Sequence, residues 1–277
     1  MMIRKVGFWC NCGKTQAVEA AVRMMRLFRR YGLEVCVDGE LSSVPGFEQC
    51  RCGFEDCDMV ATFGGDGTLL TGLQYAVAND IPVLGINMGH VGFLTEMEPG
   101  CEEACVQRIL QGDFTLEERM LLEADVAGHP VALNDATITR APSLRRIMIA
   151  SVYVNGALAE SFSGDGLIVS TPTGSTAYSF SAGGPVVQPD MELFILTPIC
   201  PHTLATRPMV VPADATVEVS VTKGSEGILA MDGKSVYYIG NEERIVLRRS
   251  MRRARFIRLN NDLFYERLRS KLMDWGH

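Results

Sequence analysis

Residues 164–176 form the most unusual stretch of this sequence, because glycine, proline and hydroxyl side chains surround one short apolar run. The apolar residues 167–169 predict a buried strand. After this strand, Pro172 lacks a backbone donor, Gly174 permits a positive φ, and five hydroxyl side chains can hydrogen-bond a polar ligand. A loop of this kind is suited to binding a nucleotide.

A second group of residues, Gly64 to Thr68, directly follows a predicted strand over residues 59–63. Two adjacent glycines let backbone amides approach a polyphosphate, and the next helix offers its N-terminal dipole. Asp66 would repel bound phosphates unless it coordinates Mg²⁺ or accepts a proton from an attacking hydroxyl, and both roles belong to phosphoryl transfer. The alternative is a tight turn whose aspartate caps a helix over residues 69–78.

Residues 7–15 imitate a phosphate-binding P-loop, since they follow a strand and end in Gly13, Lys14 and Thr15. A P-loop has four residues between its two glycines, whereas five separate Gly7 from Gly13 here, and Phe8 stands where the first glycine belongs. We interpret this segment as a chance near-match.

Three weaker features also have polar or glycine-rich chemistry. The loop within residues 85–94 again follows a strand, with Phe93 either near a ligand or in the core. Asn134 and Asp135 could bind an adenine edge or ribose hydroxyls, or form a plain turn. Asp165 lies between two glycines and could accept a hydrogen bond from a ligand or stabilise its turn.

Composition limits the class of protein. The 277 residues are expected to form two domains of a soluble, non-exported, cytoplasmic protein without a membrane segment. Nine cysteines are then expected to be reduced thiols, and the spacing of those near the N-terminus argues against a metal site. A net charge of −7 disfavours nucleic acid as a partner, and the arginines of residues 244–258 are interpreted as the solvated face of an amphipathic strand pair.

The elements that must position these residues change character along the chain. Strands alternate with helices over residues 3–86, including a helix over 15–31, and predict a parallel sheet covered by helices. From residue 116, short strands with period two predict an antiparallel β-sandwich. Residues 262–275 return to helical spacing and are expected to pack on the first domain. The expected domains are residues 1–117 with about 260–277, and residues 118–259.

Taken together, the motifs resemble the NAD kinase family, which transfers a phosphoryl group to the 2'-hydroxyl of the adenosine ribose of NAD. The resemblance covers almost the whole chain and lies in residues 64–68, 89–93, 134–135, 165–185, 198–204, 207–208 and 232–233, and in the tail from residue 264 to 275. It implies that Asp66 is the general base and that Gly64, Gly65, Gly67 and Thr68 lie near the donor phosphates.

The same resemblance implies a dinucleotide pocket that also includes Asp66 and Gly67. Its other expected members are Phe93, Asn134, Asp135, Arg146, Asp165, Thr173, Thr176, Ala177, Tyr178, Ser179, Phe180, Ser181 and Lys234. The implied substrates are NAD and either ATP or polyphosphate, with Mg²⁺ or Mn²⁺ accompanying the donor. A homodimer or homotetramer is expected, with no protein-bound metal assigned.

Two other functions use part of the same pattern. A lipid or diacylglycerol-type kinase shares the first glycine loop, but an asparagine–glutamate pair usually follows that loop, and here Leu69 and Leu70 follow it. A non-catalytic NAD sensor is expected to lack the carboxylate that Asp66 supplies.

Overall fold

The computed structural model describes residues 3–37, 39–50, 52–88, 92–97, 100–141, 147–203, 205–221, 226–240, 243–260 and 264–274. These residues form two compact units. The first unit comprises Met1–Glu118 and Ala254–His277, and the second comprises Arg119–Arg253. The division at residues 253 and 254 falls within a strand over Arg244–Arg258.

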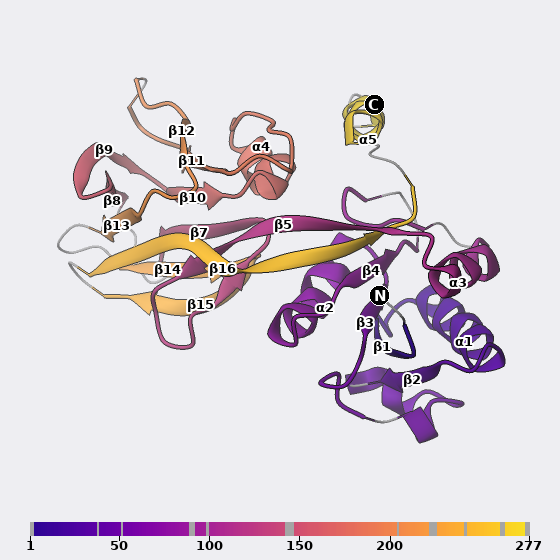
Figure 1. The fold of residues 1–277 in the computed structure, drawn as a ribbon. Coiled ribbons are helices and arrows are strands. Elements are labelled where there is room, and N and C mark those ends of the chain that lie inside the picture. Colours follow the sequence, from indigo (N-terminus) through magenta and orange to yellow (C-terminus); the bar gives the residue numbers. More distant parts are fainter. Residues whose placement is uncertain are drawn as a thin grey trace. The chain divides into compact units, whose positions relative to one another are not determined.

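The first unit is an α/β structure with a parallel sheet, which confirms the expected fold class (Figure 1). The sheet order β2-β1-β3-β4 is formed by β1 (Lys5–Cys10), β2 (Glu34–Val37), β3 (Met59–Phe63) and β4 (Val83–Ile86). Three helices accompany it: α1 (Thr15–Arg30), α2 (Asp66–Ala78) and α3 (Glu102–Gln111). The sequence analysis did not anticipate α3.

Alternation along the strands determines which helix covers which face of this sheet. Phe8 and Phe63 are fully buried in one core together with residues of α1 and α3, and their rings lie 4.7 Å apart. Trp9 points to the opposite face, where its ring lies 4.9 Å from that of Tyr75 in α2. Successive side chains of a strand point to opposite faces, so α1 and α3 lie on one side of the sheet and α2 on the other (Figure 1).

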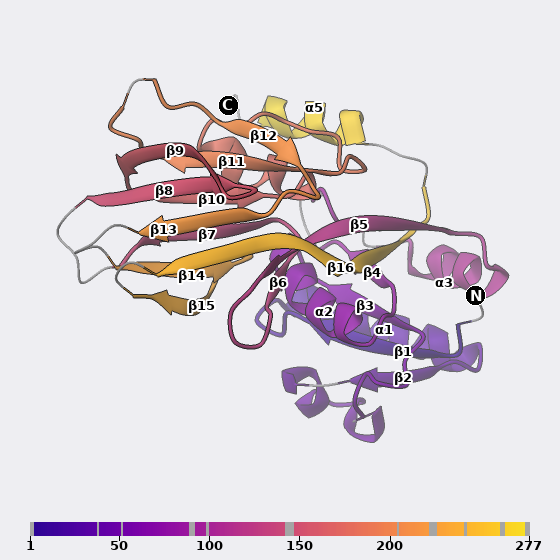
Figure 2. The same cartoon turned by 60° about the vertical axis from the view of Figure 1, so that its left-hand side comes forward.

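The second unit is an antiparallel β-sandwich, as expected, and its two sheets share one core. One sheet contains β8 (Met148–Val154), β9 (Ala157–Gly164), β13 (Val217–Val221) and the first part of β16 (Arg244–Arg258), with β5 (Thr115–Ala124) and β6 (Val131–Ala132). The other has the order β12-β11-β10-β7-β14-β15, with the bounds Met209–Pro212, Leu193–Ile199, Gly166–Ser170, Asp135–Arg140, Gly227–Met231 and Lys234–Ile239. The strands of the two sheets have nearly the same direction in space (Figure 2).

The arginine-rich residues 244–258 form one strand, β16, and not the expected strand pair. Its buried residues alternate with arginines that form ion pairs, for example Arg249 and Arg253 with Glu192, both at 2.5 Å. The solvated basic face was therefore anticipated, but the single strand was not, because alternation in the sequence does not mark where a strand turns back.

The cysteines are not all reduced thiols, contrary to expectation. Cys36 of β2 and Cys52 form a disulfide with their Cα atoms 5.3 Å apart. The backbone N–H of Cys52 donates to the Val37 carbonyl at 3.4 Å, so the chain returns to the end of β2 after a separation of 16 residues. A loop of this length gives a disulfide stabilisation of roughly 3 kcal/mol through the unfolded chain. Seven cysteines are free: Cys10, Cys12, Cys50, Cys57, Cys101, Cys105 and Cys200.

The C-terminal helix α5 (Phe264–Asp274) belongs to the first unit. Arg267 of this helix donates to the Phe93 carbonyl at 3.1 Å and to the Glu96 carboxylate at 3.2 Å. Of the helices that the structure describes, none combines the length and apolar character needed to cross a bilayer.

Candidate active site

The glycine loop joins β3 to α2 and is tightly packed at Gly64, whereas Gly65 and Gly67 face open space. The Gly64 N–H donates to the Ile86 carbonyl at 3.0 Å, and a methyl group at Gly64 would clash with the Thr68 hydroxyl. The carbonyl of Gly65 accepts the N–H groups of Thr68 and Leu69 at 2.9 and 3.1 Å. The helix therefore begins at Asp66, three residues before the predicted start, and Asp66 lies in its first turn.

The Asp66 carboxylate is held by backbone amides from a distant part of the chain. Its Oδ2 accepts the N–H of Phe93 at 3.1 Å, and its Oδ1 accepts the N–H of Leu94 at 3.3 Å. Each carboxylate oxygen has further lone pairs, so both oxygens can still accept a proton or a hydrogen bond. This long-range contact replaces the local capping role that the sequence left open for Asp66.

Gly92 is the residue that lets the carboxylate approach these amides. A Cβ at this position would overlap both carboxylate oxygens of Asp66. The Gly92 N–H donates to the Thr95 hydroxyl at 3.2 Å, which closes the turn that presents the two amides. The preceding residues 89–91, part of the predicted motif, lie outside the described residues.

A buried carboxylate behind this turn fixes its position. Glu96, whose side chain is 1% exposed, accepts hydrogen bonds from Arg258 and Arg267, both at 3.2 Å. It also accepts the backbone N–H groups of Leu259 and Asn260 at 3.1 and 2.8 Å. Buried charges persist when they are paired and hydrogen-bonded in this way. The C-terminal segments thus anchor residues 93–96, and through them the amides that hold Asp66.

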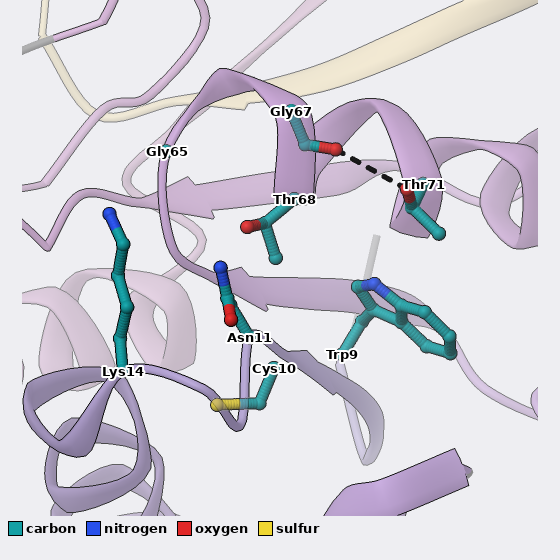
Figure 3. A pocket seen from close by; sticks show the side chains of 8 residues that line it. All are labelled: Trp9, Cys10, Asn11, Lys14, Gly65, Gly67, Thr68 and Thr71. Atoms are coloured by element: carbon teal, nitrogen blue, oxygen red, sulfur yellow. Dashed lines mark hydrogen bonds between the residues drawn. The ribbon is translucent and has the colours of Figure 1, made fainter. Parts of the chain in front are cut away.

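An open pocket of about 420 Å³ lies beside the glycine loop. It is lined by Trp9, Cys10, Asn11, Lys14, Gly65, Gly67, Thr68 and Thr71 (Figure 3). These side chains include one cation and no carboxylate. A lysine together with backbone and hydroxyl donors is suited to phosphate oxygens. The structure thus brings Gly65, Gly67 and Thr68 to one pocket, with Gly64 packed behind Thr68.

In the second unit, Asn134 and Asp135 lie against the hydroxyl-rich loop that follows β10. Asp135 pairs with Ser170 in the β7–β10 register, and the Asn134 carbonyl accepts the Thr171 N–H at 2.9 Å. A methyl group at Gly174 would clash with the Asn134 carbonyl. The pair is therefore no isolated turn, because it forms one surface with the loop.

Asp232 organises this surface, and the sequence analysis did not include it among the site residues. Its carboxylate accepts the N–H groups of Leu133, Asn134 and Asp135 at 2.8, 2.7 and 3.2 Å. Its own N–H donates to the Asp135 carbonyl at 2.9 Å, and its φ of 47° lies in the left-handed region. The available signals were the family resemblance at residues 232–233 and an Asp-Gly turn after an apolar strand, which is common between paired strands.

The Asp232 carboxylate affects the ionisation of Asp135. Burial, followed by the neighbouring Asp232 carboxylate, raises the pKa of Asp135 to about 7. Burial also raises the pKa of Asp232, while three backbone N–H groups and Lys234 oppose this effect. Asp135 is thus a buried acid whose protonation changes near neutral pH.

This pKa predicts how stability depends on pH. An Asp in an unfolded chain has a pKa of about 3.9, so the folded state binds more protons than the unfolded state between about pH 4 and pH 7. The free energy of unfolding should therefore fall as pH rises through this window, by on the order of a few kcal/mol.

Asp135→Asn mimics the protonated acid and should lose less stability between pH 5 and pH 8 than the parent protein. Urea unfolding at several pH values measures the difference. The exposed Asp214 provides the control variant Asp214→Asn, whose pH profile should follow that of the parent. Parallel profiles for the parent and Asp135→Asn would contradict the raised pKa.

Residues 173–181 form a 3-10 turn, Thr173–Thr176, and the short helix α4 (Tyr178–Ser181). Two hydroxyl groups of this segment form hydrogen bonds with other side chains of the protein. The buried Ser179 hydroxyl lies 2.8 Å from that of Thr197, and the Thr173 hydroxyl accepts a hydrogen bond from Arg119 at 3.4 Å. Tyr178 is 46% exposed. Of the predicted pocket residues in this segment, Thr176, Ala177, Tyr178, Phe180 and Ser181 are not buried.

Asp165 and Lys234 are predicted site residues outside the loop that follows β10. Asp165 precedes β10, at the opposite end of this strand from the hydroxyl-rich loop, and its carboxylate pairs with Arg140 at 3.3 Å. Five strand residues span roughly 17 Å, so the fold of one chain does not bring Asp165 to that loop. Lys234 is exposed on the turn next to Asp232. Arg146 lies outside the described residues.

Comparison with known proteins shows the family of this chain. Residues 6–114 match the ATP-NAD kinase N-terminal domain, and residues 133–259 match the ATP-NAD kinase C-terminal domain. The NAD kinase of Methanothermobacter thermautotrophicus is 37% identical over 278 residues, which cover 98% of this chain and 97% of that protein. The NAD kinase of Thermococcus gammatolerans is 40% identical over 269 residues, covering 94% and 96% of the two chains.

Solved structures show the same fold. The NAD kinase from Archaeoglobus fulgidus in complex with ATP superposes with a TM-score of 0.77 at 27% identity, covering 97% of this chain and 98% of that one. Yeast NADH kinase complexed with NADH gives a TM-score of 0.85 at 22% identity, covering 98% and 88%. This two-unit chain, with its glycine loop and its sandwich, belongs to the NAD kinase family. The family assignment supports a dinucleotide kinase over a lipid kinase.

Proposed function

We propose that this protein phosphorylates the 2'-hydroxyl of the adenosine ribose of NAD, with ATP or another polyphosphate as donor. The observation that carries the proposal is the Asp66 carboxylate, held by two backbone amides beside a glycine loop in a chain of this family. A ribose hydroxyl is a poor nucleophile near neutral pH, so a positioned acceptor for its proton has a clear catalytic use.

The proposed reaction assigns one role to each part of the first unit. The 2'-oxygen forms a bond to the terminal phosphorus of the donor while Asp66 accepts the hydroxyl proton. The bond between that phosphorus and the bridging oxygen breaks, and the shortened donor leaves with the electron pair. The donor phosphates are bound by backbone groups of Gly64, Gly65, Gly67 and Thr68 and by the Thr68 hydroxyl. The pocket beside these residues has hydrogen-bond donors and no carboxylate.

The proposed dinucleotide surface belongs to the second unit and consists of Asn134, Asp135 and the loop that follows β10. Tyr178 offers an exposed ring on which a base or ribose can pack. The proposed set on this unit is completed by Thr173, Thr176, Ala177, Phe180, Ser181 and Lys234. The buried Ser179 hydroxyl is hydrogen-bonded to Thr197, so Ser179 is proposed to stabilise this surface and not to contact the ligand.

A divalent cation, Mg²⁺ or Mn²⁺, is proposed to enter with the donor. Such ions are commonly held by substrate phosphates, water and one or two carboxylates, and the Thr68 hydroxyl is an oxygen ligand that the pocket beside the glycine loop offers. Bound there, the cation would neutralise charge on the phosphates.

The proposal also includes a cytoplasmic homodimer or homotetramer. Exposed apolar side chains of the sandwich support contact between copies: Leu158 and Val210 on the edge strands β9 and β12, and Ile149 on the neighbouring strand β8. Neither nucleic acid nor a membrane is proposed as a partner.

A donor-swap assay tests the proposed function. The purified protein is incubated with NAD, Mg²⁺ and either ATP or polyphosphate, and NADP is measured with an NADP-specific dehydrogenase. We expect NADP and ADP in equal amounts with ATP, and no product when diacylglycerol replaces NAD. Saturable NAD binding with no NADP from either donor would overturn the proposal in favour of a non-catalytic sensor.

A further inference from the structure

The segment that imitates a P-loop forms one wall of the pocket beside the glycine loop. It contributes Trp9, Cys10, Asn11 and Lys14, whereas the opposite wall belongs to the loop and the start of α2. In Figure 3, Asn11 and Lys14 extend from the turn after β1 towards Gly65 and Thr68. The glycine spacing of this segment is not that of a P-loop, but the segment nevertheless lies beside the glycine loop.

Hydrogen bonds fix the turn that presents these side chains. The Asn11 N–H donates to the Phe63 carbonyl at 3.1 Å, which ties the turn to the strand before the glycine loop. The Asn11 carbonyl accepts the Lys14 N–H at 3.0 Å, and the Asn11 side-chain oxygen accepts the Gly13 N–H at 3.2 Å. With its oxygen engaged in this way, the Asn11 side chain presents its amide NH₂ to the pocket (Figure 3).

The charges around Lys14 favour an anion. Lys14 is exposed and forms no ion pair with any residue in the described part of the chain. The first turn of α1, which Lys14 precedes, contains no acidic residue. Burial raises the pKa of the nearby Cys10 thiol to about 12, so this pocket residue is neutral at pH 7 and does not repel phosphate.

We propose that Lys14, assisted by the Asn11 amide, binds the phosphates of the donor opposite the glycine loop. This inference rests on the proposed function and adds a specific cation to it. The segment does not wrap phosphates with successive amides as a P-loop does, because its glycine spacing is wrong. It supplies one ammonium and one amide across a pocket, a contact that ATP and inorganic polyphosphate can both make.

The test compares Lys14→Met with two other variants, Lys14→Arg and Arg26→Met. The last of these removes an exposed charge within α1, the helix that follows Lys14. Lys14→Met should raise KM for ATP about tenfold or more, because a charge-assisted hydrogen bond is lost. KM for NAD should remain unchanged, and Lys14→Arg should recover most of the loss. Arg26→Met should behave as the parent protein.

Binding of inorganic tripolyphosphate, measured by calorimetry, separates this inference from the proposed function. Lys14→Met should weaken that binding about tenfold and reduce its dependence on salt, whether or not NADP is formed. Equal tripolyphosphate affinity in the parent and Lys14→Met would overturn the inference. Absence of NADP with the parent protein would instead count against the proposed function.

Discussion

Asp66→Asn is expected to lower turnover by about a thousandfold or more while NAD still binds. Removal of a positioned general base costs roughly 10²–10⁴ in rate. The asparagine NH₂ would also face the N–H of Phe93 or Leu94, so one of the two hydrogen bonds that orient the side chain would be lost. The proposed dinucleotide surface on Asn134 and Asp135 is unchanged by the substitution. Steady-state kinetics and calorimetric NAD binding measure the two effects separately.

Asp56→Asn is the matched control, because this aspartate belongs to the same unit and its side chain is 87% exposed. It should retain the turnover and thermal stability of the parent. Undiminished turnover in Asp66→Asn would reject the carboxylate as the base. Loss of NAD binding together with turnover would mean that Asp66 acts in substrate binding instead.

Gly92→Ala is expected to reduce turnover about a hundredfold without a comparable change in KM for NAD. The new methyl group would overlap both carboxylate oxygens of Asp66, so the carboxylate must move from its position on the amides of Phe93 and Leu94. Displacement of a catalytic group by about 1 Å can cost a hundredfold in rate. Single-turnover kinetics at saturating substrates measure the effect on chemistry.

Gly240→Ala provides a glycine-to-alanine control, because a Cβ there would lie 3.4 Å from the nearest atom, in Glu243. It should leave turnover unchanged. The double variant Asp66→Asn/Gly92→Ala should be hardly slower than Asp66→Asn alone, since both changes act through one carboxylate. Multiplied losses in the double variant would show that Gly92 acts by another route.

Sequence patterns identified some of the strands that the structure contains and not others. Apolar runs identified most strands of the first unit, and the change to period two marked the sandwich. The strands at Ala157–Gly164 and Leu193–Ile199 were missed. Leu193–Ile199 is buried at every position and therefore shows no alternation, whereas Ala157–Gly164 has a mostly exposed first half. Reduced thiols were wrongly expected at Cys36 and Cys52.

The sequence by itself determined the local chemistry of this protein. Glycines after strands, an aspartate in a glycine loop and a hydroxyl-rich turn are readable because backbone freedom and hydrogen-bonding capacity belong to single residues and their neighbours. These features predicted a nucleotide-binding loop and a candidate phosphoryl-transfer loop, while the kinase activity was implied by the family resemblance.

Only the tertiary structure decided which groups meet. The amides that hold Asp66 come from residues 27 and 28 positions away, and Asp232 binds amides 97 to 99 positions away. In the same way, the fold pairs the Ser179 hydroxyl with that of Thr197 and places Lys14 beside the glycine loop. The physical reason is that hydrophobic periodicity reports which face of an element is buried, while the partner across a core or a turn depends on how the whole chain folds.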